Sequence, residues 1–355
     1  MSDFIPVTRI KVFGVGGGGC NAVNRMVEAN LQGVTFYVAN TDQQVLASSK
    51  CQNKILLGYN TTHGLGAGGN PEVGKKAAEE SIQEIKEAMK EADMIFITTG
   101  LGGGTGTGAS PVFAKCAKEV GALTIGIVTK PFAFEGKKRM MQAINGLDEL
   151  RKQIDSLIII PNEKVSEILG SIPMKQAFLE ADNVLRQAVQ TITDLVGYSA
   201  TINLDFSDIK AVMSGQGAAL IGVGQVSLAE VQSNEEMAKE AARRAINCPL
   251  LDANISGAKN AIINITGADS LTIDNATAAV NYIEEVAGND IDVKFGVAYN
   301  DNLKDSIVVT VIATGFDNNS SSIFESNQQL AIPKQSVNLN DRIDVPDFFS
   351  RRNNQ

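Results

Sequence analysis

The chain has 355 residues, of which 44% are hydrophobic and 20% charged, so it can bury a sizeable core and is not disordered as a whole. Acidic residues (40) outnumber lysines and arginines (31), and the net charge of −9 argues against nucleic acid or an anionic membrane surface as the main partner. A single histidine excludes a multi-histidine metal site, and four scattered cysteines argue against a zinc ribbon or a disulfide framework.

The sequence shows no targeting or membrane-spanning segment. Residues 1–6 lack the apolar stretch of a secretory signal. The longest apolar runs, such as residues 157–160, fall far short of the ~18 residues that a membrane span needs. We therefore expect a cytoplasmic protein with no direct membrane insertion.

The first half of the chain alternates short apolar runs with helical patterns. The predicted strands are residues 9–14, 34–39, 94–99, 123–129 and 156–160. The predicted helices are residues 21–28, 71–91, 110–120 and 137–154. Strands this uniformly apolar suit a parallel sheet that helices cover on both faces. The predicted fold class is therefore α/β, with a doubly wound parallel-sheet domain over residues 1–173.

The second half has a different pattern. Residues 174–196 form one uninterrupted helical pattern, which predicts a long central helix within a connecting segment, 174–200. A predicted helix at 234–247 and predicted strands at 261–265, 293–299 and 306–312 indicate a smaller α+β domain over residues 201–315. Residues 316–340 are polar and predict a flexible linker, whereas 341–355 regain apolar residues and predict a separate C-terminal peptide.

Glycine is the most informative residue type, since 21 of the 33 glycines precede residue 137 and gather at 14–19, 64–69 and 100–108. The first group matches the dinucleotide pattern GxGxxG, which alone also fits a tight turn. In the third group the hydroxyls of Thr105 and Thr107 add donors for an anion. No Lys-Ser/Thr pair follows any of these segments, so none is a Walker A loop. Two phosphate-binding segments at successive strand ends indicate one polyphosphate held from several sides.

The segment Gly102-Gly-Gly-Thr-Gly-Thr-Gly108 resembles the signature of the tubulin/FtsZ superfamily. Five further segments resemble it in the same order, namely residues 14–23, 39–42, 64–74, 129–139 and 203–208. The resemblance, closest to the FtsZ family of cell-division GTPases, covers residues 9–316, and residues 343–349 resemble the C-terminal peptide of that family. Gly69 and Ser207 stand where the family more often has alanine, and neither change removes a functional group.

The resemblance implies a GTPase that hydrolyses GTP to GDP and phosphate and polymerises head to tail into the filaments of the cell-division ring. It implies GTP/GDP and Mg²⁺ as ligands, with Mg²⁺ held through water and the GTP phosphates and no direct protein ligand assigned. Implied partners are further copies of the chain and, through the C-terminal peptide, division proteins and membrane-tethering adaptors at the division site. Two other readings stay open: an NAD-dependent oxidoreductase using residues 14–19, and a polymerising nucleotide-binding relative without useful hydrolysis.

The resemblance also implies a guanine pocket. Phe178 and Asp182 lie four residues apart on one helix face, where a ring can stack on a purine and a carboxylate can accept from N1–H and N2–H₂ of guanine. Without the resemblance, core packing and a solvated acid would explain this pair, and a surface ion pair would explain Glu135 and Arg139. The implied nucleotide-binding residues are Gly17, Gly18, Asn21, Gly68, Gly69, Gly103, Gly104, Thr105, Gly106, Thr107, Glu135, Arg139, Asn162, Phe178 and Asp182. Asp42 could order Mg²⁺-bound water or cap a turn.

The resemblance assigns catalysis to Asp205 and Asp208, with Asn203. The spacing of the two acids also fits a helix cap before residues 209–213. A 23-residue central helix spans ~34 Å, so acids that follow its end cannot reach a nucleotide bound at its start. They could act only on the nucleotide of a neighbouring copy, and a head-to-tail contact that does not close generates an open filament.

Overall fold

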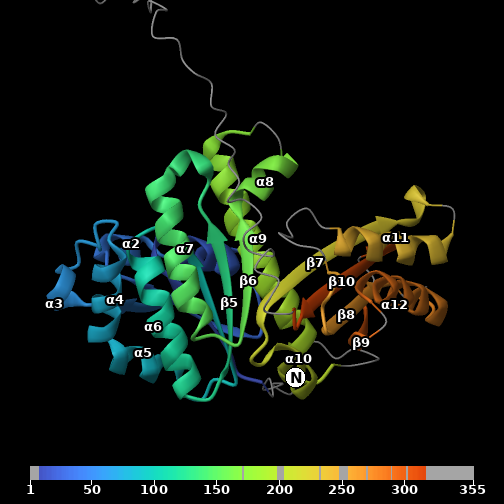
Figure 1. Ribbon diagram of the computed structural model, residues 1–355, viewed down its shortest axis with the longest axis horizontal. Helices are drawn as coiled ribbons and strands as arrows, with labels where there is room; N and C mark the ends of the chain where they lie inside the picture. The colour runs from blue at the N-terminus through green and yellow to red at the C-terminus, as the bar shows by residue number, and fades with distance from the viewer. Residues whose placement is uncertain are drawn as a thin grey trace, which may run out of the picture.

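The computed structural model describes residues 8–169, 172–197, 204–231, 233–247, 255–268, 271–288, 290–300 and 303–316. Its ten-stranded sheet has the order β3-β2-β1-β4-β5-β6-β7-β10-β8-β9 (Figure 1). The strands are β1 (Ile10–Val15), β2 (Val34–Asn40), β3 (Asn53–Leu56), β4 (Met94–Gly100), β5 (Leu123–Lys130), β6 (Ser156–Pro161), β7 (Gly217–Ser227), β8 (Asn260–Gly267), β9 (Asp292–Tyr299) and β10 (Ser306–Thr314). The helices are α1 (Gly16–Glu28), α2 (Gln43–Ser48), α3 (Tyr59–Thr62), α4 (Pro71–Glu80), α5 (Ile82–Met89), α6 (Thr105–Glu119), α7 (Lys137–Arg151), α8 (Asn162–Leu169), α9 (Met174–Gly197), α10 (Phe206–Met213), α11 (Asn234–Ile246) and α12 (Ile273–Ala287), with short 3-10 turns η1 (Ala133–Glu135) and η2 (Leu228–Glu230).

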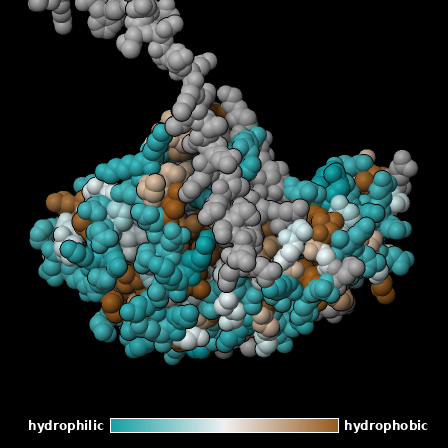
Figure 2. Space-filling view, in the orientation of Figure 1, coloured by the Kyte–Doolittle hydropathy of each residue, from teal (hydrophilic) through white to brown (hydrophobic). Residues whose placement is uncertain are grey.

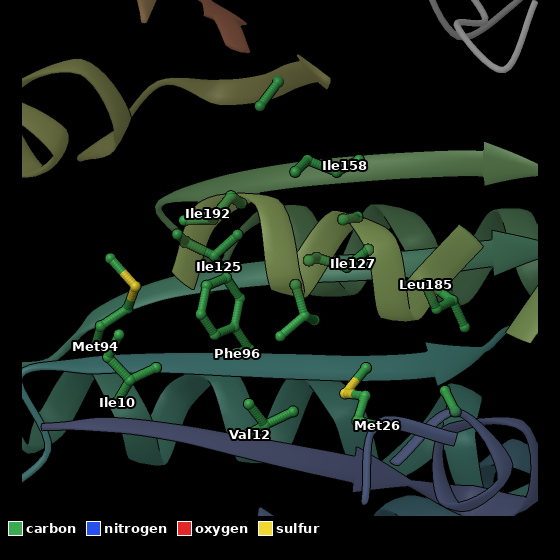
Figure 3. Close-up of a cluster of buried hydrophobic side chains, with 14 of the residues drawn as sticks. Ile10, Val12, Met26, Met94, Phe96, Ile125, Ile127, Ile158, Leu185 and Ile192 are labelled. Carbon is green, nitrogen blue, oxygen red and sulfur yellow. The ribbon is translucent and has the colours of Figure 1, made fainter. Parts of the chain in front are cut away.

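Strands β1 to β6 are all parallel, which confirms the predicted α/β fold class. Helices cover both faces of this half of the sheet. On one face, side chains of α1 and α9 such as Met26 and Leu185 pack on Val12, Phe96 and Ile125 (Figure 3). On the other face, α4, α5, α6 and α7 close a second apolar cluster. Alternate apolar residues of each strand thus enter different clusters, which is why the strands read as continuous apolar runs.

The sheet continues into the C-terminal half without a break. Ser156 to Ile158 of β6 pair in parallel with Gly217 to Ala219 of β7, and β10 then runs antiparallel between β7 and β8. Helices α11 and α12 pack on one face of these strands. The other face turns toward α9, so this helix lies between the two halves of the molecule (Figure 1).

Three helix predictions need correction. Helices α1 and α6 begin at Gly16 and Thr105, five residues earlier than predicted, because Gly16 and Gly106 pack too closely for side chains and lie in the first helical turns instead of in free loops. The single helix predicted over 71–91 is two helices, α4 and α5, which are separated at Ser81. Both helices bury apolar side chains, Ala77 and Ala78 on α4 and Ile85 and Met89 on α5.

Sequence reasoning missed two strands, β3 and β7, and four helices, α2, α3, α8 and α12. In β7, three glycines interrupt the apolar pattern; a side chain at Gly224 would overlap α11, so the close approach of that helix requires glycine there. Asn203, residues 317–340 of the predicted linker and the predicted C-terminal peptide lie outside the described residues. The face seen in Figure 2 is mostly hydrophilic over α4 to α7. No helix in the described ranges is both long and apolar enough to cross a bilayer.

Candidate nucleotide site

The glycine-rich segments meet at the carboxyl edge of the parallel strands. Strand order reverses between β1 and β4, because β2 lies on one side of β1 and β4 on the other. A doubly wound sheet opens its ligand crevice at such a point. A Cβ on Gly16 would lie 2.6 Å from the amide nitrogen of Gly106, and one on Gly18 would lie 3.1 Å from that of Gly100. Only glycine allows the two segments to approach so closely.

Around this contact, several glycines face open space. Gly17 and Gly103 would place a Cβ where no atom lies within 4 Å, and so would Gly68 and Gly69 of the neighbouring segment. The last two have φ of +59° and +72°, a conformation that favours glycine. Backbone amides at helix starts attract anions, and here α1 and α6 begin side by side. The arrangement suits a chain of phosphates.

Hydroxyl groups join the segments. The oxygen atoms of Thr41 and Thr105 lie 2.6 Å apart in a buried hydrogen bond, which ties the end of β2 to the start of α6. The amide of Gly102 donates to the hydroxyl of Thr107 at 2.8 Å, which closes the signature segment on itself. Thr41 was missed from the sequence because nothing in its local pattern reveals a partner 64 residues away.

Glu135 and Arg139 form an ion pair of 2.9 Å between Oε2 and Nε. The carboxylate is almost buried, with 8% of its side chain exposed, and it also accepts from the amide of Phe132, whereas the Arg139 side chain is half exposed. The aliphatic stem of Arg139 packs beside Gly102. This pair is therefore joined to the signature segment, unlike an isolated surface ion pair.

Phe178 belongs to an aromatic group with Phe132 and Phe134. Its ring lies edge-on to both, with centroids 5.2 and 6.2 Å away, while Phe132 and Phe134 stack at 5.2 Å. Phe178 stays 38% exposed and Phe134 59% exposed, so apolar ring surface remains available beside the site. The two partner rings lie in a segment that the sequence flagged, yet their contact with Phe178 depends on a tertiary approach of η1 to α9.

Asp182 is a mostly buried acid on α9. Burial raises the pKa of its carboxyl to about 7, and the positive charge of Arg25 on α1 opposes that rise. The described residues provide no hydrogen bond to this carboxylate strong enough to hold the pKa down. A ligand that donates N–H groups would stabilise the ionised form.

The remaining predicted side chains lie at the same edge. Asn162 begins α8 directly after β6; its side chain is buried, and its Oδ1 has no hydrogen-bond partner among the described residues. An acceptor left unpaired in this way fits a ligand that donates. Asn21 is exposed on α1. Asp42, whose role the sequence left open, caps α2 by accepting from the amides of Gln44 and Val45.

No cluster of three or more histidine, cysteine or acidic side chains able to hold a metal occurs within the described ranges. The signature segment itself offers backbone amides and the hydroxyls of the buried Thr105 and Thr107. Such a donor set fits Mg²⁺ bound through phosphate oxygens and water, which is how this ion usually binds beside nucleotides.

Asp205 and Asp208 lie at the opposite edge of the sheet. The hydroxyl of Ser156, the first residue of β6, donates to the carbonyl oxygen of Met213 at 2.6 Å, so α10 ends where the parallel strands begin. Strands of this length span ~20–25 Å. Figure 1 shows α9 running between the two edges, with α8 at one end and α10 at the other. Both acids are therefore remote from the glycine-rich segments of their own chain.

The two acids also form the helix cap that their spacing suggests. Asp205 accepts from the amide of Asp208 at 2.8 Å, and Asp208 accepts from that of Asp205 at 3.3 Å. Each bond uses a single carboxylate oxygen, Oδ1 of Asp205 and Oδ2 of Asp208. Asp205 is exposed and Asp208 half-buried, so capping leaves carboxylate oxygens accessible at the surface.

Comparison with known proteins matches two family models. The Tubulin/FtsZ family GTPase domain matches residues 9–170, and the FtsZ family C-terminal domain matches residues 217–317. An FtsZ dimer of M. jannaschii is 43% identical, with a TM-score of 0.79 and 89% of each chain covered. A mutant of that FtsZ has a TM-score of 0.80 at 43% identity, covering 87% of this chain and 91% of the other. CetZ2 from Haloferax volcanii, a GTPγS-bound protofilament, shares the fold at 20% identity and a TM-score of 0.75, covering 90% and 97%.

Proposed function

Because the chain belongs to the FtsZ family of tubulin-like GTPases, we propose that it polymerises head to tail and hydrolyses GTP at the junction between subunits. The observation that carries this proposal is the separation of the phosphate-binding segments from Asp205 and Asp208, which lie at opposite edges of one sheet. A relative of 43% identity is described as a dimer, which supports self-association.

The amides of the first turns of α1 and α6 bind the phosphates, together with the hydroxyls of Thr105 and Thr107. Arg139 supplies positive charge beside Gly102, and Glu135 holds the arginine in place. Gly68 and Gly69 line the open side of the phosphates, where a Cβ would meet no other atom. Bound Mg²⁺ would supply positive charge to the phosphate oxygens through water.

The guanine base lies against Phe178 and is read by Asp182. The carboxylate accepts from N1–H and N2–H₂, donors that adenine lacks at these positions, so GTP is preferred over ATP. Burial disfavours the ionised form of this carboxylate, and hydrogen bonds from the bound base stabilise it. The unpaired Oδ1 of Asn162 accepts from the sugar or the base, and Asn21 contacts the nucleotide from α1.

Assembly brings Asp205 and Asp208 of one subunit, with Asn203, to the γ-phosphate of the next. Their free carboxylate oxygens orient and polarise the attacking water, while backbone amides stabilise the charge on the phosphoryl group. Loss of the γ-phosphate removes contacts that order the segments at the junction, so the filament loosens after hydrolysis. The C-terminal peptide recruits division proteins and membrane-tethering adaptors to a ring at the division site.

Subunit mixing tests this proposal. Parent protein is held at a concentration too low for assembly, and the Asp208→Asn variant, inactive alone but able to bind GTP, is added in excess. Mixed filaments place parent acids against GTP on the variant, so the phosphate release rate must rise although no active subunit was added. If light scattering rises and the rate does not, the acids serve their own subunit and the proposal fails.

A further inference from the structure

A four-residue turn, Ala67–Asn70, presents free backbone amides beside the start of α6. The amide of Asn70 donates to the carbonyl oxygen of Ala67 at 3.0 Å. The two central residues, Gly68 and Gly69, have φ of +59° and +72°, the signs of a type I′ turn. Within the described part of the chain, the amides of Gly68 and Gly69 donate to no acceptor. Successive free amides of this kind form a concave site for an anion.

This turn makes few packing contacts of its own. Gly68 and Gly69 are exposed, and a Cβ on either would meet no described atom within 4 Å. On one side the turn rests on Gly104, where a Cβ would lie 2.8 Å from the amide nitrogen of Asn70. On another side a cavity of about 440 Å³ opens between α4, α6 and α7, and Pro71, which follows the turn, lines it. Contacts from outside the turn must therefore fix its orientation.

Gln142 of α7, which lines the same cavity, supplies such a contact. Its Nε2 donates to the carbonyl oxygen of Gly69 at 3.2 Å. That carbonyl and the amide of Asn70 belong to one planar peptide group. The hydrogen bond from Gln142 therefore holds the peptide group that closes the turn.

The same face of α7 contacts other phosphate-binding residues. A Cβ on Gly102 would lie 2.7 Å from Cγ of Arg139, and one on Gly146 would lie 2.3 Å from the methyl group of Thr107. Arg139, Gln142 and Gly146 are spaced i, i+3 and i+7, which places them on one side of a helix. Helix α7 thus lies against the signature segment at two points, and Gln142 connects it to the turn.

The turn lies at the far end of the site from the base. The amide of Gly66, just before the turn, donates to the carbonyl oxygen of Thr41, which follows β2. Asn162, which we propose contacts the sugar or the base, follows β6. Strands β1, β4 and β5 stand between β2 and β6, and α1 and α6 begin after β1 and β4. A nucleotide whose base lies near β6 therefore meets the turn with its last phosphate, which GTP has and GDP lacks.

We propose that Gln142 is a positioning residue that holds the turn Ala67–Asn70 in the conformation that receives the γ-phosphate, so that discrimination between GTP and GDP depends on it. This role rests on the proposed function for the identity of the nucleotide and the position of its base. It does not depend on which acids hydrolyse GTP. The base, the sugar and the first two phosphates meet other residues, so the affinity for GDP should not depend on Gln142.

Gln142→Met tests this role, because methionine removes the donor while keeping an unbranched side chain and a high helix propensity. Calorimetry on the full chain, diluted below assembly, measures the affinities for GDP and for GTPγS, which is hydrolysed slowly. The affinity for GTPγS should fall ~3–10-fold, the range that one neutral hydrogen bond supports, and the affinity for GDP by less than ~2-fold. Asn145→Met, on the same helix and in the same cavity, should leave both affinities unchanged.

Amide hydrogen exchange supplies a second readout, one that a general loss of stability would not produce. In nucleotide-free protein, the amide of Asn70 should exchange ~3-fold faster or more in Gln142→Met than in the parent, because its peptide group loses the bond to α7. The amide of Gly66, bonded to Thr41 ahead of the turn, should exchange at the rate of the parent.

An unchanged ratio of the GTPγS and GDP affinities in Gln142→Met would overturn the inference and leave the proposed function intact. An equal loss for both nucleotides would also overturn it, since Gln142 would then support the whole site. If the methionine variant does not fold, Gln142→Ala removes the same amide and carries the same comparison. A parent protein that binds neither nucleotide would refute the proposed function and the role of Gln142 together.

Discussion

Asp182 offers a prediction that separates binding from stability. Burial raises the pKa of this carboxyl from an ordinary value of 3.8 to about 7 in the folded protein without nucleotide. The unfolded chain therefore loses its proton at a lower pH than the folded chain does, and the stability of the folded state falls as pH rises from about 4 to 7. At ~1.4 kcal/mol per unit of pKa, this acid costs the nucleotide-free fold on the order of 4 kcal/mol above pH 7.

Asp182→Asn removes that cost. In urea unfolding of nucleotide-free protein, the variant should equal the parent near pH 4 and exceed it by a margin that grows by ~1.4 kcal/mol per pH unit up to about pH 7. The same variant should bind GTP at least ~100-fold more weakly, because two hydrogen bonds to an ionised acceptor contribute ~1.5–3 kcal/mol each. Greater stability would thus accompany a loss of binding.

Asp194 provides the matched control on the same helix. Burial raises the pKa of its carboxyl to about 6, against a hydrogen bond from Gln190, and it lines the cavity between α9 and the C-terminal strands. Asp194→Asn should also stabilise the protein at neutral pH but leave GTP affinity unchanged. If Asp182→Asn binds GTP as the parent does, Asp182 does not contact the base. If the stability margin of the variant over the parent does not grow with pH, burial does not set the pKa of the Asp182 carboxyl.

The remaining predictions concern the helix cap, the glycine packing and the aromatic group. Asp205→Asn keeps the helix cap, so the melting temperature should stay near that of the parent while GTP hydrolysis falls. Asp205→Ala should lose GTP hydrolysis and also ~0.5–2 kcal/mol of folding stability. Ser233→Ala removes the cap of α11 and should lower stability alone. Gly74→Ala should destabilise the fold by ~1–3 kcal/mol in urea unfolding, because a Cβ would overlap the glycine-rich segment before α6. This loss should exceed the gain from the better helix propensity of alanine. Gly17→Ala, with open space at its Cβ, should not destabilise the fold. Phe178→Ala should weaken GDP and GTP binding equally in calorimetry, since both share the base; a loss confined to GTP would contradict stacking on guanine.

The parallel half of the fold could be predicted because each strand is buried on both faces and its apolar run is continuous. β7 could not, because the approach of α11 requires glycine at Gly224 and breaks the strand pattern. The starts of α1 and α6 were placed late for a related reason: glycine is a poor helix former, and only the tight packing of Gly16 on Gly106 explains helical turns there. Local propensity was overridden by tertiary contacts in all three places.

In the candidate site, too, local features could be predicted from the sequence and tertiary contacts could not. Spacing along one helix placed Phe178 and Asp182 together, and the structure brings both to one end of α9. Sequence could not reveal that Thr41 bonds Thr105, that Phe134 joins the ring of Phe178, or that burial shifts the pKa of Asp182, since each depends on segments far apart in the chain. The roles of these residues in binding and hydrolysis stay predictions.

GTP hydrolysis per subunit, measured as a function of protein concentration, tests whether the hydrolytic site forms between subunits. The measurement records phosphate release and light scattering on the same samples. We expect a negligible rate below a threshold concentration and a steep rise where scattering appears, because Asp205 and Asp208 cannot reach the nucleotide of their own chain. A constant rate per subunit without scattering would contradict it, and both acids would then be helix caps alone.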